Sequence, residues 1–278
     1  AGYFELIYNG EGAINNINEV PQLETRIGIE ARGYSSRGFA KKQYAMELQN
    51  MDEIFPQCDD DSESFNLFCN GFSPEEGKEY NEDCIFTQEN DFVLLGPYRD
   101  RVYVRNAFSY EIWDDMGNPA SNSKHVEFIL NGVYQGIFVM FERPKMDDYR
   151  MNVGEELQCS GDGIEPECSD AGGEIHEYEG SNYCCLGGYI VKIESGGEQN
   201  FFIMDDGFTK VEYYDPKARD LGDVEKDYIR KKVVSSLYDT TSTLDTDSFS
   251  DYIISQELAK NNEGYTRSQY WYQNEGEP

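Results

Sequence analysis

The chain has 278 residues, of which 38% are hydrophobic and 14% aromatic, so it is long and apolar enough for one large or two modest folded domains. Disordered segments are poor in aromatic residues, and this composition therefore excludes a disordered chain. The 54 acidic residues outnumber the 23 basic ones, and the resulting formal charge of -31 repels nucleic acids and anionic membrane surfaces.

The first part of the chain has the patterns of strands. Apolar residues alternate between Thr25 and Leu48 on either side of a polar break at residues 33–38, which predicts two strands joined by a turn. Residues 52–91 are acidic and irregular, and we expect an inserted surface loop there. The run Phe92–Leu95 has the length and composition of a short strand.

The next segment combines a helix with a hairpin. Mixed helical spacings of apolar residues predict a helix over Arg105–Met116, and Gly117 is its expected stop. Two β-rich runs, Val126–Leu130 and Val133–Phe141, flank Asn131-Gly132, the dipeptide that gives the strongest short-range hairpin signal. We therefore expect an antiparallel pair of strands here.

The rest of the chain changes from strand patterns to helix patterns. Residues 154–187 have the composition of a second insertion, and Gly188–Glu194 alternates as a strand. Two helices are expected after it, with Asp247 or Ser248 as the cap of the second. Their apolar residues recur about every four positions, at Ile229, Val233, Leu237 and then Phe249, Ile253, Leu258. Strands first and helices last predict an α+β protein of two lobes.

Cysteine usage points to an oxidising compartment. The seven cysteines form two groups inside the two insertions: Cys58, Cys69, Cys84 and Cys159, Cys168, Cys184, Cys185. Neither group contains the C-x-x-C pair of a structural zinc site, so we predict disulfides that clamp the insertions, and hence a secreted or extracellular protein. The odd count leaves at least one thiol free or paired between chains. No apolar stretch approaches the roughly 18 residues of a membrane span, so no span is expected.

Several short runs follow one another in a fixed order outside the two insertions. They are Ile29–Tyr44, Asp91–Tyr98, Asp100 with Arg105-Asn106, Val126–Phe128 with Asn131–Gly136, Glu142 with Lys145 and Arg150, Gly187–Ile190, and Glu257–Asn261. Together they resemble the CotH kinase family, whose members look like highly diverged protein kinases. The resemblance implies a two-lobed, atypical protein kinase-like domain over residues 1–278, with a β-rich lobe over about 1–145 and a mainly helical C-terminal lobe over about 146–278.

The resemblance also implies an activity. It indicates an ATP-dependent kinase, with ATP and Mg²⁺ as cofactors, that phosphorylates Ser or Thr of secreted or coat structural proteins. A basic, Ser-rich protein substrate suits the charge of -31, although a surface adapted for solubility has the same composition. The alternative is a catalytically dead kinase-like module that serves binding or adhesion at the cell surface.

Phosphoryl transfer needs cations around the triphosphate, and the predicted strand after the turn begins with two lysines. Alternation gives Lys42 the parity of the apolar residue Tyr44, whereas Lys41 has the opposite parity, so Lys42 is expected to point inward. An inward lysine needs partners, and we expect phosphate and Glu111 in the following helix to supply them. The alternative is that Lys42 extends to the edge of the lobe and leaves its ammonium in water.

Three further features complete the expected nucleotide site. Arg37 lies in the Gly- and Ser-rich turn, whose amides are able to contact phosphate, and joins Lys41 and Lys42 as a cofactor-binding candidate, although such a turn is more often only a turn. Glu142 follows the second hairpin strand, where a kinase-like fold places the hinge that meets adenine. Asp100 is as readily a helix cap as a catalytic acid.

A further candidate catalytic acid lies near the C-terminus of the chain. Family members carry an Asp shortly after the Lys-Asn of the last helix, where this chain has Glu263, so we expect Glu263 to act as the base or the metal-side acid. The family's later Trp-Asp-Phe-Asp run, whose first Asp is thought to hold Mg²⁺, would follow Pro278. We therefore expect the domain to be incomplete at its C-terminus, and no metal ligand is assigned. Two histidines, His125 and His176, are too few for a His-rich metal site.

Overall fold

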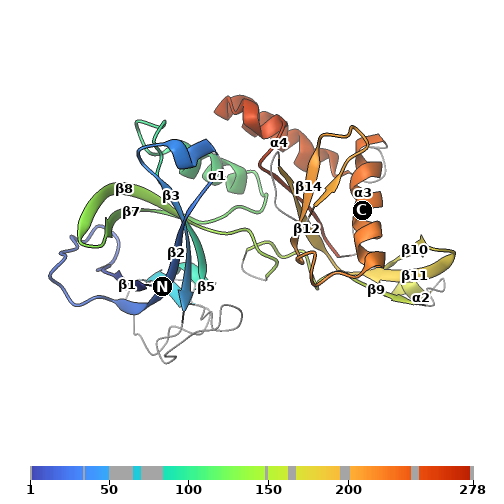
Figure 1. The fold of residues 1–278 in the computed structure, drawn as a ribbon, viewed down its shortest axis with the longest axis horizontal. Coiled ribbons are helices and arrows are strands. Elements are labelled where there is room, and N and C mark those ends of the chain that lie inside the picture. Colours follow the sequence, from blue (N-terminus) through green and yellow to red (C-terminus); the bar gives the residue numbers. More distant parts are fainter. Residues whose placement is uncertain are drawn as a thin grey trace. The chain divides into compact units, whose positions relative to one another are not determined.

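The computed structural model describes residues 2–33, 35–49, 65–69, 84–147, 150–161, 167–194, 201–238 and 244–275. The chain divides into two compact units (Figure 1). The first consists of Ala1–Glu111 and Ser121–Arg143, and the second of Ile112–Ala120 and Pro144–Pro278. Whether these units are the two lobes of a kinase stays a prediction.

The first unit is built on a curled, antiparallel, six-stranded sheet (Figure 1) with the order β1-β2-β3-β6-β8-β7. Its strands are β1 (Gly2–Leu6), β2 (Leu23–Arg32), β3 (Gln43–Gln49), β6 (Asp91–Leu95), β7 (Ser123–Leu130) and β8 (Val133–Glu142). Helix α1 (Arg105–Asp115) begins in this unit. The predicted strand pair, the short strand and the predicted helix are thus confirmed.

The predicted hairpin is confirmed in detail. Strands β7 and β8 pair antiparallel up to Leu130 and Val133, with Asn131 and Gly132 between them. These two residues have φ values of 51° and 74°. A two-residue hairpin of type I′ requires positive φ at both positions, and Asn-Gly adopts that conformation most readily.

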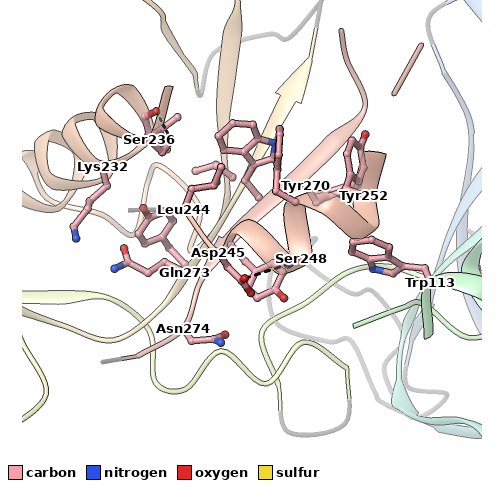
Figure 2. A pocket seen from close by; sticks show the side chains of 16 residues that line it. Trp113, Lys232, Ser236, Leu244, Asp245, Ser248, Tyr252, Tyr270, Gln273 and Asn274 are labelled. Atoms are coloured by element: carbon pink, nitrogen blue, oxygen red, sulfur yellow. Dashed lines mark hydrogen bonds between the residues drawn. The ribbon is translucent and has the colours of Figure 1, made fainter. Parts of the chain in front are cut away.

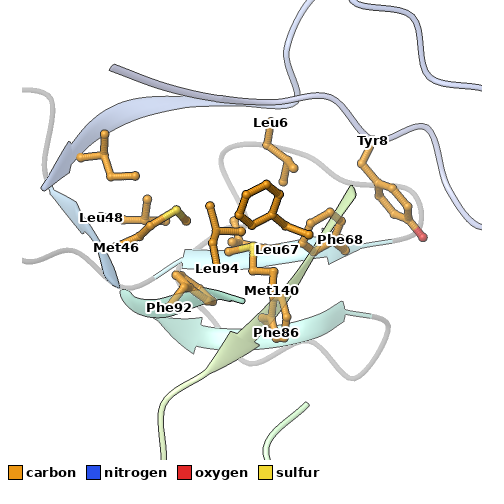
Figure 3. Packing of buried hydrophobic residues seen from close by; sticks show 12 residues of the cluster. Leu6, Tyr8, Met46, Leu48, Leu67, Phe68, Phe86, Phe92, Leu94 and Met140 are labelled. Carbon is orange, nitrogen blue, oxygen red and sulfur yellow. The ribbon is translucent and has the colours of Figure 1, made fainter. Parts of the chain in front are cut away.

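Strand alternation gives the sheet two apolar faces. Phe92 and Met140 lie on one face, in the main core (Figure 3), whereas Phe141 lies on the other face with Ala107 and Tyr110 of α1. Successive side chains of a strand point to opposite faces, so β6 and β8 contribute to both clusters. Both faces of the sheet centre are therefore covered by apolar side chains.

The first insertion corrects our expectation of an irregular surface loop. Its described residues form the antiparallel strands β4 (Phe65–Cys69) and β5 (Cys84–Glu89), which a disulfide between Cys69 and Cys84 joins. Phe86 is fully buried, and its ring lies 5.3 Å from that of Phe92. The acidic composition of this segment led to the prediction of a surface loop, but two apolar strands within it complete the main core.

The second unit contains a four-stranded sheet with the order β13-β14-β12-β15. Its strands are β12 (Tyr189–Glu194), β13 (Phe201–Ile203), β14 (Lys210–Asp215) and β15 (Gln269–Gln273). Helices α3 (Asp223–Tyr238) and α4 (Thr246–Ala259) confirm the two predicted helices. Ile229 and Val233 of α3 pack in one core cluster with Val191 and Val211 of the sheet.

The expectation of a mainly helical C-terminal lobe is wrong, because the described part of this unit contains seven strands beside its helices. The second insertion forms β9 (Gln158–Gly161), α2 (Glu167–Asp170), β10 (Glu174–Tyr178) and β11 (Ser181–Leu186). Its three strands make a separate sheet with the order β10-β11-β9. Runs rich in Tyr, Trp and Val favour strands. Two such runs, at 210–215 and 269–273, form strands that we did not expect from the sequence.

The predicted disulfides are confirmed for six cysteines. Cys159 is bonded to Cys185 and Cys168 to Cys184, in addition to the bond in the first unit. Cys58 lies outside the described residues. Three disulfides are consistent with an extracellular protein. Within the described ranges, no helix is both long and apolar enough to cross a membrane.

The cap of α4 differs from our expectation. Asp245, not Asp247 or Ser248, is the N-cap, and its carboxylate accepts hydrogen bonds from the backbone N–H groups of those two residues at 3.0 and 3.2 Å. The helix therefore begins two or three residues earlier than predicted. A boundary of this kind depends on cap geometry more than on periodicity.

Candidate functional site

Two basic segments of the first unit lie against each other. The rings of Phe39 and Tyr98 are stacked with centroids 5.1 Å apart, and the Arg99 guanidinium lies 4.9 Å from the centre of the Phe39 ring. The segments 32–42 and 99–105 together carry one acidic residue, Asp100, and seven basic ones. We call these seven residues the basic cluster: Arg32, Arg37, Lys41, Lys42, Arg99, Arg101 and Arg105.

The ammonium of Lys41 is partly enclosed by aromatic rings and a backbone oxygen. Its Nζ lies 4.5 Å from the centre of the Phe138 ring and 4.9 Å from that of Tyr103, and it donates a hydrogen bond to the Ile137 backbone oxygen. Burial lowers the pKa of Lys41 below its ordinary value of 10.5. The ammonium is partly desolvated, and the two aromatic rings offset part of that loss.

Lys41, not Lys42, therefore lies against the apolar side, so the orientation predicted from strand alternation is wrong. Strand β3 begins at Gln43, so the period of two does not extend back to Lys41 and Lys42. The Lys42 ammonium instead donates to the Arg37 backbone oxygen across the 3₁₀ turn η1 (Ser35–Gly38). This bond holds the turn, and the Arg37 side chain is exposed beside it.

Two glycines lie against the lysine pair, and Gly96 leaves no room for a side chain there. A Cβ on Gly96 would lie 2.2 Å from the Lys42 backbone oxygen and 2.9 Å from the Phe138 ring. Gly136 has φ +88°, and a Cβ there would lie 3.5 Å from the Lys41 Nζ. Neither glycine was expected to have a role, although both lie in the runs that resemble the CotH kinase family.

The expected partner of Lys42 is not beside it. Glu111 is exposed at the end of the first unit, and the structure, which describes both side chains, contains no ion pair between Glu111 and Lys42. Lys42 already has a backbone acceptor, so the inward lysine does not require Glu111. The catalytic role of Glu111 stays a prediction.

Asp100 anchors the loop that carries three of the arginines. Its carboxylate accepts hydrogen bonds from the backbone N–H groups of Arg105 and Val102 at 2.9 and 3.1 Å. Burial acts to raise the pKa of Asp100, but these hydrogen bonds and the Arg105 charge outweigh it and lower the pKa below 3.8. The interpretation of Asp100 as a structural acid at the start of α1 fits this geometry.

The two remaining candidates differ in burial. Glu142 is 2% exposed, and its carboxylate accepts a hydrogen bond from the Asn122 backbone N–H at 2.9 Å. Glu263 lies in the 3₁₀ turn η3 (Asn262–Tyr265), with a side chain that is 63% exposed and 3.5 Å from the Arg267 Nε. The hinge role of Glu142 and the catalytic role of Glu263 both stay predictions.

The fold defines a mixed α+β protein, and the basic cluster places seven cations in two segments of an otherwise acidic chain. The sequence profile of the CotH kinase protein family matches residues 29–278, so the chain belongs to the CotH kinase protein family. This membership implies a kinase-like, ATP-dependent protein. A comparison with curated proteins finds no significant match.

Proposed function

We propose that the basic cluster holds the phosphates of ATP and that the protein transfers the terminal phosphoryl group to Ser or Thr of basic, secreted proteins. One observation carries the nucleotide-binding part of this proposal. The ammonium of Lys41 is partly desolvated above two aromatic rings, at the end of a sheet and beside a turn held by Lys42. A cation that has lost water binds phosphate more strongly than one at a fully wet surface.

Charge supports the same assignment. The basic cluster stands in a chain of formal charge -31, so its field differs in sign from that of most of the surface. A triphosphate is drawn to this region and repelled elsewhere. A basic protein substrate is drawn to the acidic remainder, which allows the two substrates to bind at separate places. Lys41, Lys42 and Arg37 are the proposed phosphate contacts.

Two acidic residues have proposed roles in the reaction, and neither is proposed as a metal ligand. Among the described residues, no three His, Cys, Asp or Glu side chains lie close enough to hold a metal ion. We therefore propose no residue as a ligand of Mg²⁺ and assign no step to that ion. Glu263 is proposed to orient the attacking hydroxyl, and Glu111 to pair with Lys42 when the nucleotide is bound.

Nucleotide binding and phosphate transfer test the proposal separately. We expect calorimetry to detect ATP binding that weakens in Lys41→Ala but not in Lys124→Ala, whose ammonium lies 5.4 Å from the Tyr8 ring outside the basic cluster. Transfer of radiolabelled phosphate to a basic, Ser-rich peptide then tests the activity. Equal ATP affinity in the parent and Lys41→Ala would exclude Lys41, the residue that carries the proposal, from the phosphate site.

One observation favours the alternative of a kinase-like binding module. Glu263 replaces the family's Asp, is largely exposed and already pairs with Arg267. A longer carboxylate displaces its oxygens by about one methylene, and a misplacement of that order costs about a hundredfold in rate. ATP binding without any phosphate transfer would support this module over the kinase.

A further inference from the structure

The second unit contains a pocket that none of the proposed kinase residues lines (Figure 2). It has a volume of about 170 Å³ and lies between strands β12 and β15 and helices α3 and α4. Trp113, in the segment that belongs to this unit, closes one side. Ten of its sixteen lining residues are aromatic or aliphatic, which is the usual composition of a small-molecule site.

The aromatic walls are held in place by hydrogen bonds within the protein. The indole N–H groups of Trp113 and Trp271 and the hydroxyl of Tyr252 each donate to a protein oxygen, at 2.9, 3.0 and 2.6 Å. Trp113 packs edge-on against Tyr252, and Phe249 packs edge-on against Trp271. These polar hydrogens are already used, so the walls offer an occupant mainly ring surface.

The charged groups at the pocket already have partners within the protein. The ammonium of Lys232 lies 2.6 Å from the carboxylate of Glu174. The carboxylate of Asp245 accepts the two backbone N–H bonds that cap α4. A charged occupant would lose water without gaining a new opposite charge, so the pocket favours a neutral one.

Uncharged polar groups complete the lining. Ser236 of α3, Ser248 of α4 and the amides of Gln273 and Asn274 all line the pocket, and Figure 2 shows Ser236, Gln273 and Asn274 on the side away from Trp113. The Ser236 hydroxyl donates to the Val233 backbone oxygen at 2.8 Å, so it offers an occupant its oxygen as an acceptor. Hydroxyl and amide groups recognise hydroxyl groups of a ligand, while the aromatic side recognises a ring. The two halves of the pocket thus differ in chemistry.

The volume of the pocket limits the size of its ligand. A cavity of about 150 Å³ holds one benzene molecule, so a pocket of about 170 Å³ accepts a single six-membered ring with small substituents. We propose that this pocket binds a neutral, hydroxyl-bearing six-membered ring, with its ring face on the aromatic side and its hydroxyl groups toward Ser236, Gln273 and Asn274. Phenols and hexoses share this chemistry. The proposal is independent of the kinase assignment.

The chain supplies its own reporter for the test. Trp113 and Trp271 are its two tryptophans, and both line the pocket. We expect phenol or glucose to change the tryptophan fluorescence saturably and to give a saturation-transfer NMR signal. A response to phenol alone identifies an aromatic ligand, and a response to glucose alone a sugar. No saturable response to either probe would overturn the proposal.

Two pocket-filling variants and one control locate the binding. Ser236→Phe fills the pocket from α3 at a buried position, and Ser248→Phe fills it from α4 at a half-buried one where folding is less at risk. Ser250→Phe, on an exposed position of the same helix outside the pocket, is the matched control. We expect Ser248→Phe to abolish the response and Ser250→Phe to keep it. An unchanged response in folded Ser248→Phe, with thermal unfolding as the check of folding, would contradict the proposed site.

Discussion

The ammonium of Lys41 lies 4.5 Å from the centre of the Phe138 ring, so a cation is seated on the apolar face of the sheet at the edge of the main core. Its neighbour Lys42 is instead used to hold a turn. The two lysines are adjacent in sequence, but the ammonium of Lys41 lies against an aromatic ring and that of Lys42 bonds to a turn. Substituting each lysine separately therefore tests which of them contacts ATP.

The first prediction separates the two lysines by their effect on ATP. We expect Lys41→Ala to weaken ATP binding by about 10- to 100-fold, because a hydrogen bond to a charged group contributes about 1.5–3 kcal/mol. Lys42→Ala should weaken binding less and make η1 more mobile, because its ammonium bonds to the Arg37 backbone. Calorimetry and amide hydrogen exchange at residues 35–38 measure the two effects. A larger loss of affinity in Lys42→Ala would restore the assignment made from alternation.

The second prediction concerns Gly96, which lies against the lysine pair. A Cβ at Gly96 would meet backbone at 2.2 Å, so Gly96→Ala must displace β6 or the segment before β3 and should cost about 1–3 kcal/mol of unfolding free energy. Gly38→Ala is the matched control, since no heavy atom lies within 4 Å of its added Cβ. Urea unfolding of both variants checks the difference. Equal stability would mean that the 96–98 segment does not press on the lysines.

Local signals explain why part of this fold was predictable. The hairpin follows from Asn131-Gly132, whose backbone preference does not depend on the rest of the chain. The α3 helix follows from the buried Ile229 and Val233, one turn apart. Both features are encoded within a few residues, and both were predicted correctly.

Features that depend on distant segments were missed. The orientation of Lys41 depends on where β3 begins, and that boundary follows from its pairing with β2 and β6. Phe86 entered the core although its surroundings are acidic. The pocket joins Trp113 to residues more than 70 positions away, and no local pattern indicates it. Tertiary pairing, not local preference, decides each of these.

A third prediction follows from the cysteine count. Three disulfides use six of the seven cysteines, so thiol titration of the unfolded, unreduced protein should find one thiol. Cys58→Ser should lower the count to zero. Five or more thiols in the parent would exclude the oxidised, extracellular interpretation.

A fourth prediction uses the buried His176. Burial and the nearby Lys231 lower the pKa of His176 below its ordinary value of 6.5, and the hydrogen bond to Asp227 at 3.1 Å opposes this only in part. Its ring also forms a T-shaped contact with the ring of Tyr228, with centroids 5.5 Å apart. Between the folded pKa and 6.5, the unfolded chain therefore holds more protons on this side chain than the folded one.

The sign of the pH effect follows from that difference. The stability linked to His176 is fully present above pH 6.5 and is lost as the pH falls toward the folded pKa. His176→Gln should remove this part of the slope of unfolding free energy against pH, whereas His125→Gln serves as the control for loss of the other histidine. Denaturant unfolding between about pH 5 and 8 measures both slopes. An unchanged slope in His176→Gln would show that the side chain titrates equally in both states.

The last prediction tests Glu263 as the residue that orients the attacking hydroxyl. Glu263→Gln keeps the size of the side chain and removes its charge, so phosphate transfer should fall about 100-fold or more, the usual contribution of a general base, while ATP affinity stays nearly constant. Glu263→Asp restores the family's residue and should raise transfer if one methylene misplaces the carboxylate. Arg267 lies 3.5 Å from this carboxylate, and Arg267→Gln should change transfer without abolishing it. Steady-state transfer of phosphate to a basic peptide measures these effects. Unchanged transfer in Glu263→Gln would exclude Glu263 from catalysis. Lower transfer in Glu263→Asp would show that this site requires the longer side chain.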